Sequence, residues 1–350
     1  MLGYRAGLWH EPPTPAFVNP PSFAALPPPP PGKTGWPWTQ TVPPPAIDPG
    51  RAGEWPVVTI VTPSYRHEGY IEETIRSILL QGYPRLEYIV MDGGSKDETV
   101  AILQKYTPWI TYWESVPDKG QCDAINKGFA RSTGQILNWI NSDDYLLPGA
   151  LFKLAANAGA WAALADRERP GFVAGAGHMC DAQGVPLDHF YTVAPRQLVE
   201  NIRFGNPTLQ PATFFNRRFW EELGPFDLTL HFTFDWELWI RACARGMAVR
   251  CLPEFLAAAH QHEEQKTETG AEPRFVEMAQ MLLRNAGGDL EYAGLVRAVA
   301  RLRSWFIPFC GGPHTRRCHY GRWLMVALLQ RRFRNVSRGQ VHNLMTILGA

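Results

Sequence analysis

The stretch Val57-Val-Thr-Ile-Val-Thr-Pro-Ser-Tyr65 opens a segment, ending at Asp144, that decides the fold of this chain. Three short apolar runs in the segment, at 57–61, 86–90 and 135–140, have the length and composition of buried strands. Apolar residues at helical spacing lie between these runs. Because strands alternate with helices, the sequence predicts an α/β fold with parallel strands that are covered on both faces.

A polar cluster follows each of these predicted strands. The clusters are Thr62 to Arg66, Met91 to Ser95, and Asn141 to Asp144. In an open α/β sheet, ligands bind beyond the carboxyl ends of the strands, which is where all three clusters fall. Two of the clusters supply carboxylates, so the sequence predicts a site for a metal ion and a nucleotide.

Composition limits the class of protein. The chain has 350 residues, of which 45% are apolar and 19% charged, with a formal net charge of +1. These values suit a soluble protein with a substantial core and give no electrostatic case for nucleic acid. No apolar run reaches the ~18 residues of a membrane-spanning helix, and residues 1–5 do not begin a signal peptide. Six cysteines without paired spacing indicate reduced thiols, so we expect a cytoplasmic protein.

Three regions follow one another along the chain. Residues 1–54 form a proline-rich leader that we expect to be extended or disordered. In the alternative, Trp36 and Trp38 dock on the body or on a partner. Residues 55–265 form the α/β domain, and 266–350 form a helical C-terminal extension. Other expected elements are a helix opened by a capping box of Ser95 and Glu98, strands over 110–116, 172–179, 210–215 and 248–252, and helices over 69–80, 148–165 and 234–245.

Asp143 and Asp144 are adjacent acids at the end of a predicted strand. Such a pair is unfavourable unless a cation or hydrogen-bond donors compensate the charge. Mg²⁺ or Mn²⁺, held by one or two carboxylates and by substrate phosphates, fits this pattern. The alternative is a pair of turn or capping acids, but Pro148 sets the next helix start four residues beyond Asp143.

Asp92 follows a buried strand and precedes two glycines, which let a ligand approach the backbone. A carboxylate in this place accepts hydrogen bonds from a ribose or a base in dinucleotide folds. The alternative is an ordinary turn aspartate.

Four motifs together resemble the family 2 inverting glycosyltransferases. They are Val58-Thr-Ile-Val-Thr-Pro-Ser-Tyr65, Met91-Asp-Gly-Gly-Ser-Lys-Asp-Glu-Thr99, Pro117-Asp-Lys-Gly-Gln121 with Ala124-Ile-Asn-Lys-Gly128, and Asn141-Ser-Asp-Asp144. The resemblance runs from about Val57 to at least His262. It implies a GT-A fold, with a mostly parallel central sheet flanked by helices, a nucleotide-sugar donor, and Mg²⁺ or Mn²⁺ as cofactor.

The resemblance also implies roles for the matching residues. It implies that the base and ribose are held by Pro63, Ser64, Tyr65 and Asp92, that the donor pocket is lined by Asp118, Lys119 and Gln121, and that Asp143 and Asp144 touch the metal and the donor ribose. Asn141 stands where the family more often has an acid, so either Asp143 or Asp144 is the direct metal ligand. Lys119 has a plainer alternative as a solvated loop lysine.

Two acids compete for the role of catalytic base. Glu237 has Arg241 four residues later and is expected to form a surface ion pair with it, whereas Asp235, at the helix start, points elsewhere. The resemblance also places the base at Asp235, where the commoner Glu-Asp pair is Phe234-Asp235. This carboxylate is expected to take a proton from an acceptor hydroxyl.

In His260-Gln-His262, the resemblance places His262, which matches better than His260, near the diphosphate or the metal; the alternative is a surface histidine. Cys310, His314, Cys318 and His319 match no standard zinc spacing and are read as thiols and loop histidines. The apolar and basic residues at 323–334 are expected to pack on the catalytic body, with a peripheral contact to the inner face of a membrane as the alternative.

The predicted function is transfer of a sugar, with inversion, from a nucleotide-sugar to a hydroxyl of a glycan or lipid-linked saccharide, in polysaccharide biosynthesis. A sugar-phosphate nucleotidyltransferase is one alternative, but it needs a glycine-rich basic loop, and 62–69 holds one arginine and one glycine. A non-catalytic carbohydrate-binding scaffold is the other, and Asp143, Asp144 and Asp235 argue against it.

Overall fold

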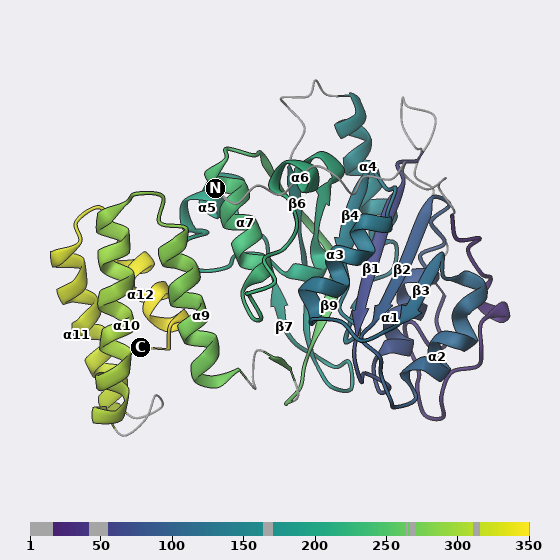
Figure 1. The fold of residues 1–350 in the computed structure, drawn as a ribbon, viewed down its shortest axis with the longest axis horizontal. Helices are drawn as coiled ribbons and strands as arrows, with labels where there is room; N and C mark the ends of the chain where they lie inside the picture. The colour runs from purple at the N-terminus through teal and green to yellow at the C-terminus, as the bar shows by residue number, and fades with distance from the viewer. Residues whose placement is uncertain are drawn as a thin grey trace. The chain divides into compact units, whose positions relative to one another are not determined.

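The computed structural model describes residues 17–41, 55–163, 171–263, 265–266, 270–310 and 316–349. These residues form two compact units (Figure 1). Unit 1 consists of the chain up to Tyr191 together with 209–225 and 252–261, and unit 2 consists of 192–208, 226–251 and 262–350. The division into leader, domain and extension made from the sequence stays a prediction.

Unit 1 is built on a nine-stranded sheet in the order β3-β2-β1-β4-β8-β6-β9-β5, with β7 paired to β6. Strands β1, β2, β3 and β4 pair in parallel, and β4–β8, β8–β6, β6–β7 and β5–β9 pair antiparallel. The strands are β1 Val58–Ser64, β2 Leu86–Asp92, β3 Tyr112–Ser115, β4 Ile136–Trp139, β5 Asp144–Leu146, β6 Phe172–Asp181, β7 Pro186–Phe190, β8 Thr213–Asn216 and β9 Val249–Gln261.

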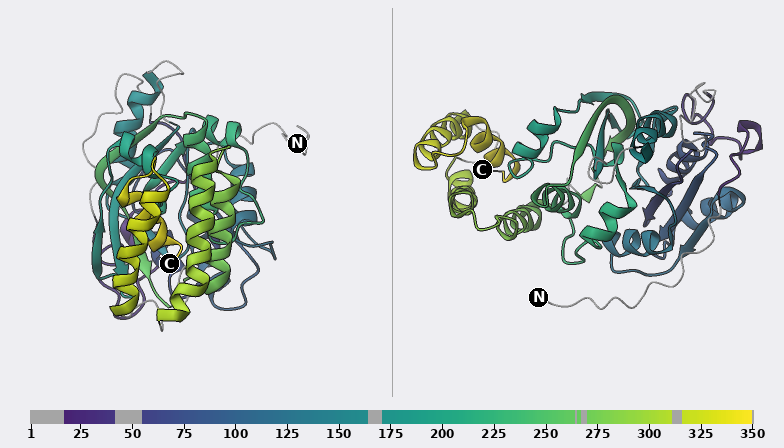
Figure 2. Two further views of the ribbon diagram at one scale, coloured as in Figure 1. Left: turned by 90° about the vertical axis from the view of Figure 1, so that its left-hand side faces the viewer. Right: turned by 90° about the horizontal axis from the view of Figure 1, so that it is seen from above.

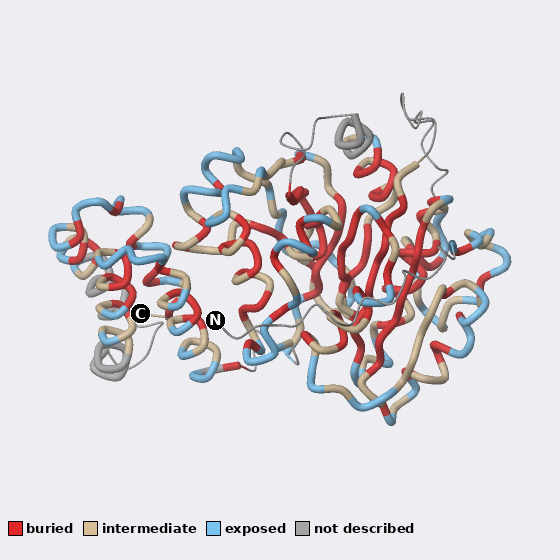
Figure 3. The backbone as a smooth tube through the Cα atoms, turned by 45° about the horizontal axis from the view of Figure 1, so that its top comes forward, coloured by how far each residue is buried: buried red, intermediate tan, exposed pale blue. Residues whose placement is uncertain are grey.

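Helices cover both faces of the parallel part of the sheet. Because side chains alternate along a strand, Ile60 and Val61 of β1 point to opposite faces. Ile60 joins one core with α1 Ile71–Leu79, α2 Thr99–Tyr106 and α4 Ala150–Ala163. Val61 lies against α3 Gln121–Arg131, on the side where α6 Arg217–Leu223 packs on Phe129. Strands β1, β2 and β4 are therefore buried along their whole length (Figure 3).

The predicted fold class is confirmed, and three local expectations are wrong. Helix α2 begins at Thr99 without a side-chain cap, because the Ser95 hydroxyl donates to the Asp92 carboxylate instead. The strand expected over 210–215 begins as a short 3₁₀ helix at Gln210–Ala212, after which β8 follows. Strand β9 is longer than expected, because it continues past 252 to pair with β5.

The described part of the leader, 17–41, lies on unit 1 and contains a single turn of 3₁₀ helix at Phe23–Ala25. Its Trp38 side chain is buried, and the Trp36 indole donates to the Leu146 carbonyl at 2.8 Å. The buried Arg76 guanidinium of α1 donates to the carbonyls of Pro27, Pro37 and Trp38 at 2.7, 3.2 and 3.3 Å. This part of the leader therefore docks on the body, which was the alternative to an extended or disordered leader.

Helices dominate the described residues of unit 2. They are α5 Pro195–Asn201, α7 Phe234–Ala244, α9 Ala271–Arg284, α10 Leu290–Cys310, α11 Arg316–Arg332 and α12 Arg338–Ile347. The last four, green to yellow in Figure 2, confirm the helical C-terminal extension. None of the described helices has the length and apolarity needed to cross a membrane. The cysteines and histidines weighed as a zinc site, at 310–319, fall outside the part of the chain whose side chains are described.

We predict that Arg76→Met loosens the leader from unit 1. The substitution removes hydrogen bonds to three leader carbonyls and one to the Tyr106 hydroxyl, so we expect unfolding to become easier by about 3 kcal/mol. Urea unfolding gives the free energy, and limited proteolysis reports cleavage within 17–41. Arg218→Met, which removes an exposed ion pair with Glu222, is the control and should cost less than about 1 kcal/mol. Equal losses in the two variants would contradict the structural role of Arg76.

Candidate functional site

The three polar clusters meet at one edge of the sheet in unit 1. Parallel pairing sets Ser64, at the end of β1, opposite Asp92, at the end of β2. The Arg66 amide donates to Ser95 Oγ at 2.8 Å, which joins the first cluster to the second. His67, the residue after the first cluster, places its Nδ1 2.7 Å from Ser142 Oγ and so connects that cluster to the third. The edge at which the sequence predicted a ligand site therefore carries all three clusters.

Asp92 is buried and its carboxylate is hydrogen-bonded within the protein. It accepts from the amides of Gly94 and Ser95 at 3.1 and 2.9 Å, and from the hydroxyls of Ser95 and Ser115 at 2.6 Å each. Three of these bonds end on Oδ2 and one ends on Oδ1. The bonds fix the loop after β2, while Oδ1 keeps the capacity to accept one further hydrogen bond.

Tyr65 and Asp118 both lie close to Gly93. A Cβ atom at Gly93 would meet Asp118 Oδ2 at 3.1 Å and Tyr65 Cδ2 at 3.3 Å, so only glycine leaves this space open. The Tyr65 ring is 53% exposed, and the Arg66 guanidinium lies 5.1 Å from its centre. Burial raises the pKa of Asp118, and the charges of Asp123 and Asp92 act in the same direction. An exposed ring beside a carboxylate offers a stacking surface and a hydrogen-bond acceptor together.

Lys119 is exposed on the loop after β3, and its amide donates to Asp123. An exposed side chain is open to solvent and to a donor alike, so the role of Lys119 stays a prediction. Pro63 and Ser64 are buried at the carboxyl end of β1, so they form part of this edge.

Asn141 connects Gln121 to the acid pair. Its Oδ1 accepts from Gln121 Nε2 at 2.7 Å, and its Nδ2 donates to Asp144 Oδ2 at 3.1 Å and to Gln210 Oε1 at 3.3 Å. An aspartate at 141 would have no proton for these two acceptors, which accounts for an amide here. The sequence analysis missed Gln210, because it lies in no motif and only the fold brings it to this edge.

Asp143 and Asp144 lie at the start of β5 with different surroundings. Burial, and then the charge of Asp143, raise the pKa of the buried Asp144 carboxyl well above its usual range. Among the described residues, no group of three or more His, Cys, Asp or Glu side chains is arranged to hold a metal ion. A pair of acids that disfavours its own ionisation nevertheless fits a cation held by one or two carboxylates and by phosphate oxygens.

Of the two candidate histidines, His260 is the one seen to contact the acid pair. Its buried ring places Nδ1 2.5 Å from the Asp143 carbonyl, and its Nε2 lies 4.0 Å from Glu73 Oε2. His262 belongs to unit 2. The motif His260-Gln-His262 alone does not show the alternation that turns His260 inward, and the prediction from the sequence therefore favours His262. The role of His262 stays a prediction.

In unit 2, the two acids of α7 have different partners. Glu237 forms the predicted ion pair with Arg241, with oxygen–nitrogen distances of 2.9 to 3.2 Å. Asp235 accepts a hydrogen bond from Asn206 Nδ2 at 3.3 Å. Burial raises the pKa of Asp235 to about 6, although the charge of Arg274 acts against this rise. A carboxyl with this pKa is suited to accept a proton near neutral pH.

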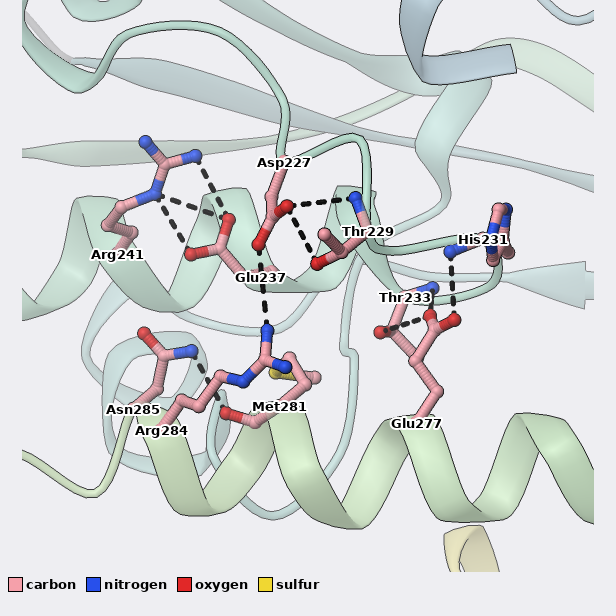
Figure 4. A network of polar contacts seen from close by, with 10 residues as sticks. All are labelled: Asp227, Thr229, His231, Thr233, Glu237, Arg241, Glu277, Met281, Arg284 and Asn285. Atoms are coloured by element: carbon pink, nitrogen blue, oxygen red, sulfur yellow. Dashed lines mark hydrogen bonds and ion pairs between the residues drawn. The ribbon is translucent and has the colours of Figure 1, made fainter. Parts of the chain in front are cut away.

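The carboxylate of Glu277, on α9, holds the loop that precedes α7 (Figure 4). Glu277 accepts from the amides of His231, Phe232 and Thr233 at 2.8, 2.8 and 2.9 Å, and from the Thr233 hydroxyl at 2.9 Å. Since Asp235 is two residues beyond this loop, Glu277 positions the start of the helix that carries it.

We predict that Glu277→Ala releases this loop. Three amides and one hydroxyl lose their acceptor, so we expect a loss of about 2 kcal/mol in the free energy of unfolding. Faster hydrogen exchange at 231–233 should accompany it. Glu272→Ala, on the same helix, removes an exposed ion pair with Arg303 and should leave the exchange rates unchanged. Unchanged exchange at 231–233 in Glu277→Ala would show that other contacts hold the loop.

Known proteins resemble the chain in both sequence and fold. The sequence model of glycosyl transferase family 2 matches residues 59–220. An uncharacterized glycosyltransferase of Mycobacterium tuberculosis is 28% identical over 206 residues, which cover 56% of this chain and 73% of that protein. An uncharacterized glycosyltransferase of Rickettsia typhi is 28% identical over 229 residues, which cover 61% of this chain and 67% of that protein.

The solved structures of S. aureus TarS show a similar fold. TarS 1–349 has a TM-score of 0.54 at 18% identity, over 83% of this chain and 90% of that chain. TarS 1–349 in complex with UDP-GlcNAc has a TM-score of 0.53 at 17% identity, with the same coverage. In a longer TarS structure, the match spans 44% of that chain. Residues 59–220 therefore match glycosyl transferase family 2, and the chain has the GT-A fold.

Proposed function

We propose that this chain moves a sugar from a nucleotide-sugar to an acceptor hydroxyl and inverts the anomeric centre. The observation that carries the proposal is the meeting of three polar clusters at the carboxyl edge of β1, β2 and β4, within the residues that match the family. S. aureus TarS is known in complex with UDP-GlcNAc, so UDP-sugars come first among the donors to test.

The donor base and ribose are assigned to the edge around Gly93. The exposed Tyr65 ring supplies a stacking face, and the Asp118 carboxylate beside it accepts hydrogen bonds. Asp92 acts mainly through the loop that it fixes, and Gln121 acts through Asn141. Pro63, Ser64 and Lys119 complete the proposed donor site.

Asp143 and Asp144 are the proposed holders of Mg²⁺ or Mn²⁺, with His262 as a further ligand. Support comes from the raised pKa of Asp144, because a buried acid next to a second acid is stabilised as an anion by a cation. When bound, such a cation neutralises the charge that builds on the departing diphosphate. Asn141 keeps the Asp144 carboxylate oriented by its hydrogen bond.

Asp235 is the proposed catalytic base. Its carboxylate takes the proton of the acceptor hydroxyl while that oxygen attacks the anomeric carbon from the side opposite the nucleotide. A single displacement of this kind inverts the anomeric centre. Arg241 holds Glu237 in an ion pair, which leaves Asp235 as the acid of α7 assigned to the proton.

The proposed acceptor is a glycan or a lipid-linked saccharide at the cytoplasmic face of a membrane. On α11, Leu324 and Leu328 are 52% and 48% exposed, and the exposed Arg331 and Arg332 follow them. Exposed apolar side chains beside arginines suit an anionic lipid surface. The products would then enter a cell-surface polysaccharide.

We predict that Asp235→Asn abolishes most of the activity. An amide cannot take the acceptor proton, so nucleotide release from UDP-, GDP- and dTDP-sugars with Mn²⁺ should fall by about 10²-fold or more. Glu237→Gln, two residues away on the same helix, should retain turnover within a few-fold of the wild type. Wild-type turnover in Asp235→Asn would remove Asp235 from the role. No release by the wild type from any donor would favour the scaffold alternative, and pyrophosphate formation from a sugar phosphate and a nucleoside triphosphate would favour the nucleotidyltransferase.

We also predict an acid limb in the pH profile. The raised pKa of Asp235, about 6, keeps the carboxyl protonated and inactive below this pH, so kcat/KM should rise through pH 6 and then level off. Glu237→Gln should keep this limb. A limb near pH 4 would mean that the folded protein does not shift Asp235.

A further inference from the structure

Four aromatic rings gather on the edge hairpin of unit 1, and the proposed reaction uses none of them. His178 lies on β6, His189 on β7, Tyr191 just after β7, and Phe255 on β9. The ring centres are 4.9 Å apart for His178 and His189, 4.7 Å for His178 and Phe255, and 5.5 Å for Tyr191 and Phe255. We call these four residues the aromatic platform.

Sheet pairing explains why the platform forms. His178 and His189 stand directly opposite each other in the β6–β7 ladder, so their side chains share one face of the hairpin. Tyr191 is two residues beyond His189, and its ring lies 6.2 Å from that of His189. Strand β7 pairs with β6 alone in the described sheet.

The platform is open to solvent. The Tyr191 side chain is 64% exposed, and Leu187, two residues before His189, is 57% exposed. His189 is also exposed, whereas His178 and Phe255 are half-buried beneath them. A single exposed ring needs no explanation, but a packed group of rings at one edge is an apolar surface suited to a ligand.

The histidine pair adds polar groups of defined kind. The Nδ1 atoms of His178 and His189 are 2.9 Å apart, so one ring donates a proton to the other. The donating ring then carries a lone pair on Nε2, and the accepting ring carries an N–H there. Burial and the neighbouring His189 lower the pKa of His178, which favours this neutral pair. The pair thus offers one donor and one acceptor beside the rings.

We propose that the aromatic platform binds a saccharide unit of the acceptor. A pyranose has an apolar C–H face, which stacks on an exposed aromatic ring, and hydroxyl groups that both donate and accept hydrogen bonds. The aromatic rings of the platform supply the stacking surface, and its histidine pair supplies the donor and the acceptor. The inference rests on the proposed function for calling the saccharide an acceptor. A zinc ion at the two histidines is the competing occupant, but two ligands fall short of the three or four that zinc sites have.

The test measures saccharide binding by saturation-transfer NMR in the absence of a donor. The probes are disaccharides of glucose, galactose and N-acetylglucosamine, in buffer with EDTA. We expect transfer to the C–H protons of at least one disaccharide, and binding about tenfold weaker for Tyr191→Ala. Val185→Ala trims an exposed apolar residue in the turn of the same hairpin and should bind like the wild type. Because Tyr191 is exposed, its variant should unfold at the wild-type temperature.

Donor turnover separates this inference from the proposed function. Tyr191→Ala should release nucleotide from the donor alone as fast as the wild type, because the platform takes no part in the donor site. Equal saccharide binding by wild type and Tyr191→Ala, or binding by neither, would overturn the platform. Binding that needs a metal and is lost in EDTA would also overturn it. If the wild type releases no nucleotide while Tyr191→Ala still loses saccharide binding, the platform stands and the transferase proposal fails.

Discussion

The parallel pairing of β1 with β2 and β4 is the constraint on which the site in unit 1 depends. Strands covered on both faces accept few polar side chains along their length, so polar groups accumulate where the strands end. Parallel register then brings those ends to one edge, with Ser64 opposite Asp92. Polar residues that the buried strands exclude therefore gather at this edge and form the candidate site.

Buried carboxyl groups differ in what surrounds them. Asp92 receives four hydrogen bonds and serves the loop, whereas burial raises the pKa of Asp144 and Asp235. The same residue type is thus fixed by several hydrogen bonds in one place, whereas burial dominates its pKa in the other two.

Much of the fold and part of the site are readable from the sequence. The apolar runs at 57–61 and 86–90 predict β1 and β2 because fully buried strands need continuous apolar residues. The capping prediction at Ser95 fails because a hydroxyl next to a turn carboxylate has a stronger local partner than a helix amide. The length of β9 was missed because Ala257, Ala258 and Ala259 have little strand preference, and pairing with β5 decides their conformation. Gln210 and His260 were missed for a related reason, since only tertiary contacts bring Gln210 to Asn141 and His260 to Asp143.

Arg76 recognises the leader through the main-chain carbonyls of Pro27, Pro37 and Trp38, and its guanidinium also lies 5.8 and 5.4 Å from the ring centres of Phe23 and Trp38. Proline lacks an amide proton, so a proline-rich chain forms few internal hydrogen bonds and keeps its carbonyls available. The aromatic residues Phe23, Trp36 and Trp38 add side-chain contacts to this main-chain recognition. The proline-rich leader thus provides carbonyl oxygens that accept hydrogen bonds from the buried, charged guanidinium of Arg76.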